Sequence, residues 1–344
     1  MKKIVIHKPG DYSVLKIEEF ADPVPADNEV LIKVHFIGVN YADIVVRWGL
    51  YKSAKDFVGW PITPGFEISG TVEKTGSKIT KFKPGDRVFA VTRFGGYTTH
   101  LCVTEDLVFP LPKNLTLEQA AGFPAVYLTA YHALFQNIVV PPQAKILIHS
   151  AGGGVGSALV QLAKWKGCEV TGIVGSSHKV EFVKSSGADF VIDKSSQNLW
   201  REAEKISPAG FDIIADANGA ETLKKSYDHL ASSGKLLVYG FHTMMPKQGG
   251  KVDWIKLIRM YLKTPRFNPL DMTSDNKSVI AFNLSYLFDK KELFTLATHH
   301  LISLIESGNI KGPSTTLFDF VRVGEAHKAL ESGKTTGKII LSLN

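Results

Sequence analysis

One stretch in the middle of the chain has the residue types that bind a phosphate group through backbone atoms. It is the glycine-rich turn, residues 150–156, which follows an apolar run and reads Ser-Ala-Gly-Gly-Gly-Val-Gly. Residues without bulky side chains let the backbone approach a pyrophosphate, which then faces free N–H groups and the positive end of a helix dipole. The spacing Ala151-x-Gly153-x-x-Gly156 matches the dinucleotide fingerprint, with alanine at the first glycine position. We therefore predict a dinucleotide site whose cofactor contacts include Gly152, Gly153, Gly154 and Val155.

The residues after the next predicted strand indicate which dinucleotide is bound. An NAD site has an acidic residue at the end of this strand, where it accepts a hydrogen bond from the ribose 2′-hydroxyl. Here the strand ends at Val174, and the first acidic residue is Glu181, inside the next predicted helix. The sequence therefore favours NADP(H), with a phosphate site formed by Gly175, Ser176, Lys179 and Lys194. The alternative is that both lysines are ordinary surface residues.

The elements that would position these residues alternate along the second half of the chain. Strand-like and helix-like runs follow each other from about residue 118, which predicts a doubly wound parallel sheet covered by helices on both faces. The predicted strands are 145–149, 169–174, 189–192, 211–215, 235–239 and 279–284, and the helices include 155–166, 178–186 and 222–230. This context on both sides of the glycine-rich turn favours a dinucleotide site over a structural turn.

The first third of the chain has a different pattern. Short β-branched and aromatic runs are separated by turn signals such as Pro84-Gly85-Asp86, which predicts a compact, barrel-like domain. The run 339–343 is strand-like and no helix follows it, so we expect it to return to this first domain. The first domain would then be discontinuous, and two domains are expected for 344 residues.

The composition is that of a globular protein, with 44% hydrophobic and 21% charged residues. The formal charge of +7 comes from scattered lysines and arginines, so we interpret it as a solvated surface with a phosphate site and expect no nucleic-acid partner. Cys102 and Cys168 form neither a CxxC pair nor a disulfide framework. The longest apolar region, 123–135, is too short to span a bilayer. We therefore expect a cytoplasmic protein.

Two motifs near the start of the chain resemble metal-binding sequences but lack the metal ligands. The run Gly65-Phe66-Glu67-Ile68-Ser69-Gly70 is similar to the GHExxG box of medium-chain alcohol dehydrogenases, with Phe66 in place of the zinc-ligating His. Asn40 stands where those enzymes have a ligand Cys, and the sequence has no four-cysteine lobe for a structural zinc. A phenylalanine ring has no lone pair for a metal, so we expect no metal site.

These motifs, in this order and over essentially the whole chain, resemble the zinc-independent quinone oxidoreductase branch of the medium-chain dehydrogenase/reductase superfamily. The segments that look closest to the vesicle amine transport protein homologues are 40–43, 205–208 and 254–286. The resemblance implies an α/β fold with a Rossmann NADP-binding domain at 123–299. It also implies a discontinuous GroES-like β-barrel catalytic domain, formed by 1–122 and 300–344, and a nicotinamide held in the cleft between the domains.

The resemblance further implies roles for individual residues. Asn40 and Tyr51 are expected at the reaction centre, with Asn40 also near the nicotinamide. The residues expected to line the cofactor are Thr129, Asn218 and Phe241. Without zinc, the oxygen that gains charge needs a side-chain donor or water, and conjugated acceptors such as quinones and α,β-unsaturated carbonyls spread that charge themselves. We interpret Asp43 as structural, either capping a short helix or pairing with Arg47.

Two functions stay open at this point. The first is an NADPH-dependent reductase of quinones or α,β-unsaturated carbonyls. The second is a membrane-surface or transport-associated protein that keeps the cofactor site but has little catalysis. The second is favoured by the segment 247–266, where lysines and arginines interleave with large apolar residues as in an interfacial helix. We prefer to interpret this segment as a helix packed over the cleft, with its basic side in solvent.

The β-prone run 278–284 predicts self-association. It lies late in the Rossmann half, where the last strand of the sheet is expected, and no lysine or proline interrupts it. A strand at a sheet edge exposes unpaired N–H and C=O groups, which can pair with a second copy across a two-fold axis. We therefore expect a homodimer, and the alternative is that the segment 254–276 covers this edge and leaves a monomer.

Overall fold

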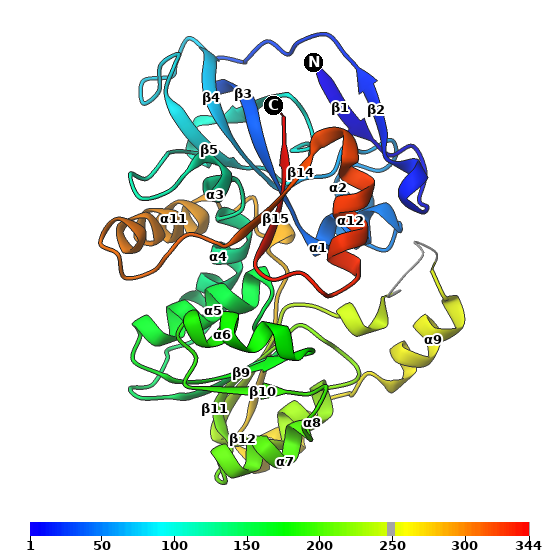
Figure 1. Ribbon diagram of the computed structural model, residues 1–344, viewed down its shortest axis with the longest axis vertical. Coiled ribbons are helices and arrows are strands. Elements are labelled where there is room, and N and C mark those ends of the chain that lie inside the picture. Colours follow the sequence, from blue (N-terminus) through cyan, green and yellow to red (C-terminus); the bar gives the residue numbers. More distant parts are fainter. Residues whose placement is uncertain (246–251, 344) are drawn as a thin grey trace. The chain divides into compact units, whose positions relative to one another are not determined.

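The computed structural model describes residues 1–245 and 252–343, which form two compact units. The first unit contains residues 1–128 and 284–343, and the second contains residues 129–245 and 252–283. Each unit has its own β-sheet (Figure 1). The prediction of a discontinuous first domain is therefore confirmed.

The first unit is built around a seven-stranded sheet in the order β14-β15-β3-β4-β5-β7, with β6 paired to β3. The strands are β3 (Glu29–Val39), β4 (Glu67–Thr75), β5 (Arg87–Val91), β6 (His100–Thr104), β7 (Val108–Pro110), β14 (Thr315–Asp319) and β15 (Lys338–Ser342). A separate antiparallel pair consists of β1 (Lys2–Val5) and β2 (Lys16–Glu19). Strand β15 is antiparallel to β3, with Ile339 opposite Val39, so the late strand returns to the first unit as predicted.

Six helices accompany this sheet within the described residues. They are α1 (Tyr41–Arg47), α2 (Lys52–Phe57), α3 (Leu117–Ala121), α4 (Pro124–Tyr131), α11 (Lys291–Glu306) and α12 (Val323–Glu331), and α4 continues into the second unit. The pair β14 and α12 was not anticipated from the sequence. The Ala-rich stretch 120–136 is not one continuous helix but the end of α3, then α4 and a π-helical turn at His132–Gln136. Pro124 explains the interruption, because proline favours the first turn of a new helix.

The division between the units differs from the predicted domain boundaries. Residues 123–128 and 284–299 belong to the first unit rather than to the Rossmann domain. Side chains from other parts of the first unit contact α11 near both of its ends. Lys291 Nζ lies 2.7 Å from Asp106 Oδ2, and Asn114 Nδ2 donates to the carbonyl of Ile305 at 3.1 Å. The amphipathic pattern of α11 predicts a helix but does not indicate which sheet it covers.

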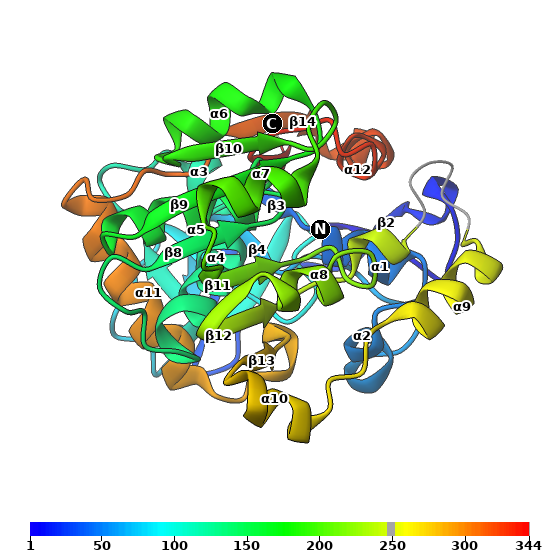
Figure 2. The ribbon, with the colours of Figure 1, turned by 90° about the horizontal axis from the view of Figure 1, so that it is seen from below.

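The second unit has a six-stranded sheet in which every pair is parallel, in the order β10-β9-β8-β11-β12-β13 (Figure 2). The strands are β8 (Lys145–Ile148), β9 (Glu169–Val174), β10 (Phe190–Asp193), β11 (Phe211–Asp216), β12 (Leu230–Val238) and β13 (Ser278–Ala281). This is the 3-2-1-4-5-6 order of the Rossmann fold, which reverses direction between β8 and β11. Ligands of such sheets bind at the carboxyl ends of the strands beside that reversal.

Helices cover both faces of this parallel sheet. The helices of this unit are α5 (Gly154–Trp165), α6 (Val180–Ser185), α7 (Leu199–Ile206), α8 (Leu223–Asp228), α9 (Trp254–Lys263) and α10 (Pro269–Asp275), of which α5 to α8 pack on the sheet. Helices α5 and α6 lie on one face, and α7 and α8 lie on the other (Figure 1). On the α7 and α8 face, Leu147, Ile214 and Leu236 belong to one buried cluster, against which Trp200 packs. No helix among the described residues is both long and apolar enough to cross a membrane.

Candidate functional site

The glycine-rich turn connects β8 to α5 at the carboxyl end of the second unit's central strand. Its first residue, Ser150, has a left-handed backbone with φ +55°, which is uncommon for a residue other than glycine. Gly153 N–H donates to the Ser150 carbonyl at 3.0 Å. A Cβ on Gly156 would lie 2.2 Å from the same carbonyl oxygen, so only glycine fits at the start of α5. The turn is therefore a close-packed backbone structure rather than a flexible linker.

The N-terminus of α5 has backbone N–H groups that make no hydrogen bond within the helix. The helix is 12 residues long and Gly153 is its N-cap residue, which has no side chain to accept from these groups. The first N–H groups of a helix lack intrahelical partners and carry a partial positive charge. Gly152, Gly153, Gly154 and Val155 therefore lie where the sequence predicted contacts to a pyrophosphate.

Two cationic side chains lie along the predicted 2′-phosphate site. The stem of Lys179 packs on the turn, since a Cβ on Gly152 would lie 3.1 Å from Lys179 Cδ. Burial lowers the pKa of Lys179. Gly175 follows β9, and a Cβ there would lie 3.7 Å from Lys194 Cε. Lys179 and Lys194 are thus brought to the same edge of the sheet, next to Gly152 and Gly175.

A carboxylate that the sequence analysis missed lies at this edge. Asp193 ends β10 and accepts hydrogen bonds from Ser177 Oγ at 2.5 Å and from Ser195 Oγ at 2.6 Å. These hydroxyl donors lower the pKa of Asp193 to about 2. The sequence reading looked for an acid only at the end of β9, whereas this acid follows the neighbouring strand. Its negative charge opposes the attraction of the two lysines for a phosphate.

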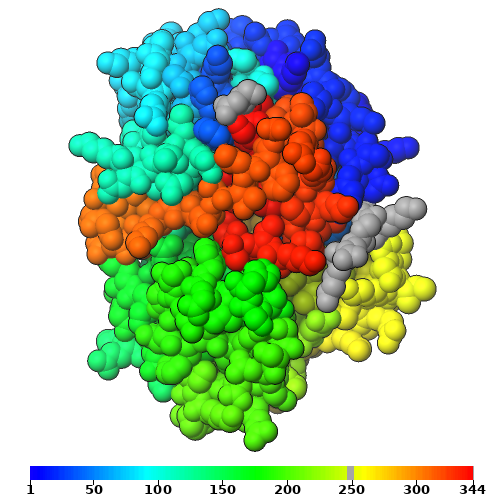
Figure 3. Space-filling view, in the orientation of Figure 1, coloured from blue at the N-terminus to red at the C-terminus, as the bar shows by residue number. Residues whose placement is uncertain are grey.

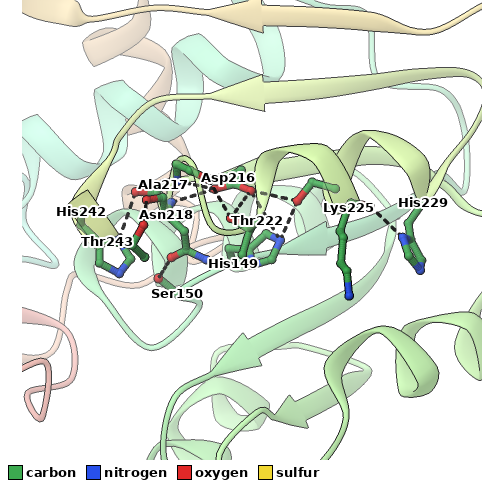
Figure 4. Close-up of polar contacts among 12 residues, drawn as sticks. His149, Ser150, Asp216, Ala217, Asn218, Thr222, Lys225, His229, His242 and Thr243 are labelled. Atoms are coloured by element: carbon green, nitrogen blue, oxygen red, sulfur yellow. Dashed lines mark hydrogen bonds and ion pairs between the residues drawn. The ribbon is translucent and has the colours of Figure 1, made fainter. Parts of the chain in front are cut away.

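Behind the turn is a buried group of polar side chains that we name the Asp216 network (Figure 4). Its members lie at the carboxyl ends of β8 and β11, just before α8, or on α8. They are His149, Ser150, Asp216, Asn218, Thr222 and Ser226. Asp216 Oδ1 accepts from the backbone N–H groups of Asn218 at 2.7 Å and Gly219 at 3.2 Å. Asp216 Oδ2 accepts from Thr222 Oγ1 at 2.7 Å and Ser226 Oγ at 2.9 Å. Four donors therefore satisfy a fully buried carboxylate, and His149 Nε2 lies 3.7 Å from its Oδ2.

The Asp216 network fixes the direction of the Asn218 side chain. Its side chain is buried and bonded on both ends, to His149 Nδ1 at 3.1 Å through Nδ2 and to Ser150 Oγ at 3.1 Å through Oδ1. This side chain therefore faces the protein interior, whereas the sequence analysis expected it to line the cofactor. Phe241, which is 42% exposed, packs on Gly219, and Thr129 is half-buried on α4.

In the first unit, Asn40 belongs to a second buried group, the Glu67 network, formed by Asn40, Glu67 and Lys338. Asn40 Nδ2 donates to Glu67 Oε1 at 2.9 Å, and Asn40 Oδ1 accepts from Lys338 Nζ. Lys338 Nζ also lies 2.6 Å from Glu67 Oε1, and both side chains are almost fully buried. A substrate oxygen would have to compete with Glu67 for the Asn40 amide. Asn40 is thus held by an ion pair that the sequence analysis did not identify.

Asp43 and Arg47 occupy the same helix but do not form an ion pair with each other. Asp43 caps α1, accepting from the N–H groups of Asn40 and Gly65, each at 2.8 Å. Arg47 instead lies 2.5 Å from Glu331 Oε1 on α12, and donates to His327 Nδ1 at 3.2 Å. The capping prediction for Asp43 is confirmed, and the predicted Asp43–Arg47 pair is wrong. Burial raises the pKa of Asp43 to about 7 despite its two N–H donors.

Tyr51 lies in an aromatic cluster with the residue that replaces the zinc ligand. The Tyr51 ring packs edge-on against Phe66 and Phe94, with centroids 6.0 Å and 6.4 Å away. Its hydroxyl is 3.4 Å from Ser285 Oγ, a long hydrogen bond. Within residues 1–245 and 252–343, no three His, Cys, Asp or Glu side chains are grouped so that they could hold a metal ion. This cluster brings together three aromatic rings, packed mainly edge to face, and one phenol hydroxyl.

Two residues of the Glu67 network, Glu67 and Lys338, were not identified as site residues from the sequence. Glu67 lies in a motif that the analysis quoted only for its missing His. Lys338 is the first residue of β15. In the sequence it looks like an ordinary surface lysine, because its partner Asn40 lies 298 positions earlier. A cation at the buried start of a strand is the signal that could have identified it.

Family models match both parts of the chain. Residues 26–113 match the alcohol dehydrogenase GroES-like domain, and residues 154–284 match the zinc-binding dehydrogenase family. These matches fall on the first unit's main sheet and on the parallel sheet of the second unit.

Individual relatives extend the match to the whole chain. The Danio rerio synaptic vesicle membrane protein VAT-1 homolog is 31% identical over 99% of this chain and 70% of its own length. The Homo sapiens quinone oxidoreductase is 31% identical over 100% of this chain and 98% of its own length. The structure of Escherichia coli quinone oxidoreductase complexed with NADPH has a TM-score of 0.85 at 29% identity, covering 99% of this chain and 100% of that one. The chain therefore belongs to the medium-chain dehydrogenase/reductase superfamily, close to the VAT-1 homologues and the quinone oxidoreductases.

Proposed function

We propose that the protein is an NADPH-dependent oxidoreductase that transfers hydride, without zinc, to quinones or α,β-unsaturated carbonyls. The observation that carries this function is the glycine-rich turn before α5, where a Cβ on Gly156 would lie 2.2 Å from the Ser150 carbonyl oxygen. A turn this tight at the carboxyl end of the central strand is the feature that dinucleotide-binding sheets use for a pyrophosphate. The Escherichia coli quinone oxidoreductase that shares the fold was solved with NADPH.

The residues present fit this cofactor. The pyrophosphate would be held by the N–H groups at the start of α5, and Lys179 and Lys194 would face the 2′-phosphate beside Ser176. Phe241 offers an exposed aromatic edge after β12. When bound, the nicotinamide supplies the hydride, and the protein supplies binding, orientation and electrostatics.

The chain's own residues then prepare the acceptor. The aromatic cluster of Tyr51, Phe66 and Phe94 provides an apolar surface that excludes water and suits a flat conjugated acceptor. The Tyr51 hydroxyl can donate to the acceptor oxygen as that oxygen gains charge. The Glu67 network keeps Asn40 fixed at the start of α1. The acceptor takes up one proton together with the hydride, and solvent supplies this proton.

The absence of a zinc requirement rests on the side chain at position 66. Phe66 cannot ligate a metal, and Asn40 is already bonded to Glu67 and Lys338. We expect elemental analysis of the purified protein to give no stoichiometric zinc, and chelators to leave its activity unchanged. One tightly bound zinc per chain would overturn this part of the function.

The central test is NADPH oxidation with a panel of quinones, enones and alkenals, with alcohols and NADP⁺ as the negative control. Lys179→Ala should weaken NADPH binding about tenfold and leave NADH binding unchanged, because each charge-assisted contact contributes roughly 1.5–3 kcal/mol. Lys184→Ala is the matched control, since this exposed lysine on α6 pairs with Glu181. Equal affinity of the wild-type protein for NADPH and NADH in titration calorimetry would contradict the cofactor preference.

The proposal includes a homodimer. Strand β13 is the last strand of the parallel sheet, and Val279 and Ile280 on it are only partly buried. Such an edge can continue into a second copy of the sheet across a two-fold axis. Light scattering at micromolar concentration should give twice the chain mass of 37.7 kDa, and a mass near one chain would rule the dimer out.

A second candidate function is favoured by the surface of α9. Five large apolar side chains, Trp254, Ile255, Ile258, Tyr261 and Leu262, are 57–74% exposed at helical spacing. Figure 3 shows this segment in yellow as part of the molecular surface. The preferred sequence interpretation was a packed helix, but α9 buries only Met260 among its residues. Residues 247–251 of the same predicted segment lie outside the described residues.

The charge of α9 complements an anionic membrane surface. The helix carries Lys256, Arg259 and Lys263 and no acidic residue. An apolar stripe flanked by lysines and arginines is the pattern of helices that lie in a bilayer interface. We therefore expect the protein to float with vesicles containing phosphatidylserine and not with phosphatidylcholine alone.

Paired variants make this test specific. Ile255→Ser combined with Leu262→Ser should abolish flotation, whereas Leu296→Ser, at an exposed leucine on α11, should leave it unchanged. If the wild-type protein fails to float with either vesicle, or the α9 variant floats as well as wild type, this second function is excluded. NADPH oxidation by the same variants should be unaffected.

A further inference from the structure

The Asp216 network has no part in the hydride transfer described above, yet it includes Ser150, the first residue of the glycine-rich turn (Figure 4). We propose that His149 is a positioning residue of the cofactor site, which acts through Asn218 on Ser150 and so holds the turn in its binding shape. This role rests on the proposed NADPH-binding function. It adds three residues, none of which needs to touch the cofactor through its own side chain.

The hydrogen bonds of the network can be assigned a single direction. Asp216 is a carboxylate and only accepts, so the hydroxyl proton of Ser226 points to its Oδ2 at 2.9 Å. Ser226 Oγ must then accept from His149 Nε2 at 3.1 Å. His149 Nδ1 is therefore unprotonated and accepts from Asn218 Nδ2 at 3.1 Å. This fixes the amide orientation of Asn218 and turns its oxygen toward Ser150.

The last bond of this series reaches the strained residue of the turn. Ser150 Oγ donates to Asn218 Oδ1 at 3.1 Å, while the Ser150 backbone is held at φ +55°. A left-handed backbone is unfavourable for serine, so surrounding contacts must maintain it. The Ser150 carbonyl in turn accepts from Gly153 N–H at 3.0 Å and contacts the start of α5. The hydroxyl bond to Asn218 is thus one contact that keeps the turn shaped before any cofactor arrives.

Asn218 also joins this turn to the loop after β12. Its backbone carbonyl accepts from Thr243 N–H at 3.0 Å and from Thr243 Oγ1 at 2.7 Å. The loops after β8, β11 and β12 are therefore connected through one residue. Since His149, Asp216 and Asn218 are all at most 1% exposed, water cannot replace the bonds among these three residues. Burial lowers the pKa of His149 to about 4, although the nearby Asp216 acts to raise it. The imidazole is therefore neutral at physiological pH.

Two substitutions at Ser150 separate the hydrogen bond from the backbone strain. Ser150→Ala removes the hydroxyl but keeps the cost of a left-handed backbone, so NADPH must restore the turn as it binds. We expect its Kd for NADPH to rise about tenfold, by titration of NADPH fluorescence. Ser150→Gly also lacks the hydroxyl but adopts this backbone freely, so its Kd should rise less than about threefold. Equal losses in the two variants, or no loss in either, would overturn the positioning role.

Two substitutions at His149 provide a conservative rescue. His149→Asn places an amide oxygen close to the position of Nδ1, where it can still accept from Asn218, whereas the longer side chain in His149→Gln reaches toward Ser226. We expect KM for NADPH to rise about tenfold in His149→Gln and less than about threefold in His149→Asn, with kcat at saturating NADPH unchanged in both. Ser207→Ala is the control, because it removes a buried hydroxyl that bonds the Gly210 carbonyl before β11. A change in kcat alone would contradict a positioning role.

The tautomer of His149 gives a readout that does not need the cofactor. Nitrogen-15 spectra of the wild-type protein should show His149 protonated on Nε2 and bare on Nδ1 near pH 7, and Asn218→Leu should release this preference. If wild type does not bind NADPH but shows this tautomer, the proposed function fails while the network stands. If wild type binds NADPH and the tautomer is reversed, the positioning role fails while the function stands.

Discussion

The two units satisfy a buried carboxylate in different ways. In the first unit, Glu67 is paired with the ammonium of Lys338 at 2.6 Å and also accepts from the N–H group of Ala125 at 2.7 Å. In the second unit, Asp216 is satisfied by two N–H groups and two hydroxyls, and its neighbour His149, 3.7 Å away, is kept neutral by burial, which lowers its pKa to about 4. Each carboxylate accepts a hydrogen bond from an asparagine that follows a strand, Asn40 after β3 and Asn218 after β11. The first arrangement depends on one opposite charge, whereas the second distributes the same task over four neutral donors.

This difference predicts unequal tolerance to the loss of a partner. Removing a cation leaves a buried charge without compensation, while removing one neutral donor of four leaves the remaining three. The first unit should therefore be sensitive at single positions, and the second should lose cofactor affinity before it loses stability.

The largest effect is expected for Lys338→Met. The substitution keeps most of the side chain's volume but leaves Glu67 buried and unpaired, so the free energy of unfolding should fall by about 3–5 kcal/mol. Chemical denaturation followed by circular dichroism measures this loss. Lys328→Met on α12 is the matched control at an exposed lysine and should change stability by less than about 0.5 kcal/mol. The double variant Glu67→Gln with Lys338→Met should recover much of the loss. If Lys338→Met alone changed the free energy of unfolding only slightly, the expected difference in tolerance between the two units would be wrong.

An effect of intermediate size is expected for the pH dependence of stability, which should have opposite signs in the two units. Burial raises the pKa of Asp43 from 3.8 to about 7, so between pH 4 and 7 the folded state keeps a proton that the unfolded state has released. From this group, the first unit loses stability as pH rises through that window, by at most about 1.4 kcal/mol per pH unit. Burial lowers the pKa of His149 from 6.5 to about 4, so the unfolded state binds the extra proton. From this group, the second unit loses stability as pH falls from 6.5 to 4.

Hydrogen exchange measured by mass spectrometry can follow the two units separately. Peptides from β3 and β4 report on the first unit, and peptides from β8 and β11 report on the second. Asp43→Asn should flatten the pH dependence of the first set only, and His149→Asn that of the second set only. Parallel pH profiles in both sets of peptides would show that the units do not differ in this way.

The smallest effect is expected for Asp193→Asn. Asp193, like Asp216, is satisfied by neutral donors, so neutralising it leaves no cation unpaired. The substitution removes a negative charge beside the predicted phosphate site, and NADPH affinity should rise about threefold. NADH affinity should stay the same, which serves as the internal control. Weaker NADPH binding would mean that Asp193 orients Ser177 for the phosphate rather than opposing it.

The sequence predicted those parts of the fold and site that depend on neighbouring residues. The glycine-rich turn, its flanking strand and helix, and the helix cap at Asp43 all lie within a few positions of their partners. The return of β15 to the first unit was also predicted, because a strand without a following helix has no place in an alternating sheet.

The errors concern partners that are distant in sequence. Arg47 has a suitable acid four positions away, yet it pairs with Glu331, 284 positions later. Helical spacing alone cannot show that a buried partner from another element is available. The family resemblance implied that Asn218 lines the cofactor, and the structure shows that its side chain bonds inward to His149. Residue type and position along a strand place a loop at the edge, while the direction of each side chain depends on what is packed beneath it.

The path of the chain through the first unit has a consequence for protein synthesis. Strand β15 lies between β14 and β3 in the sheet and carries the ammonium partner of Glu67. The ribosome makes β3 about 300 residues before it makes β15, and the whole second unit is translated in between. The second unit has all of its strands available first and can fold while translation continues. The early strands of the first unit meanwhile keep an open edge and a buried acid without its partner, so they are the part of the nascent chain that chaperones would need to protect.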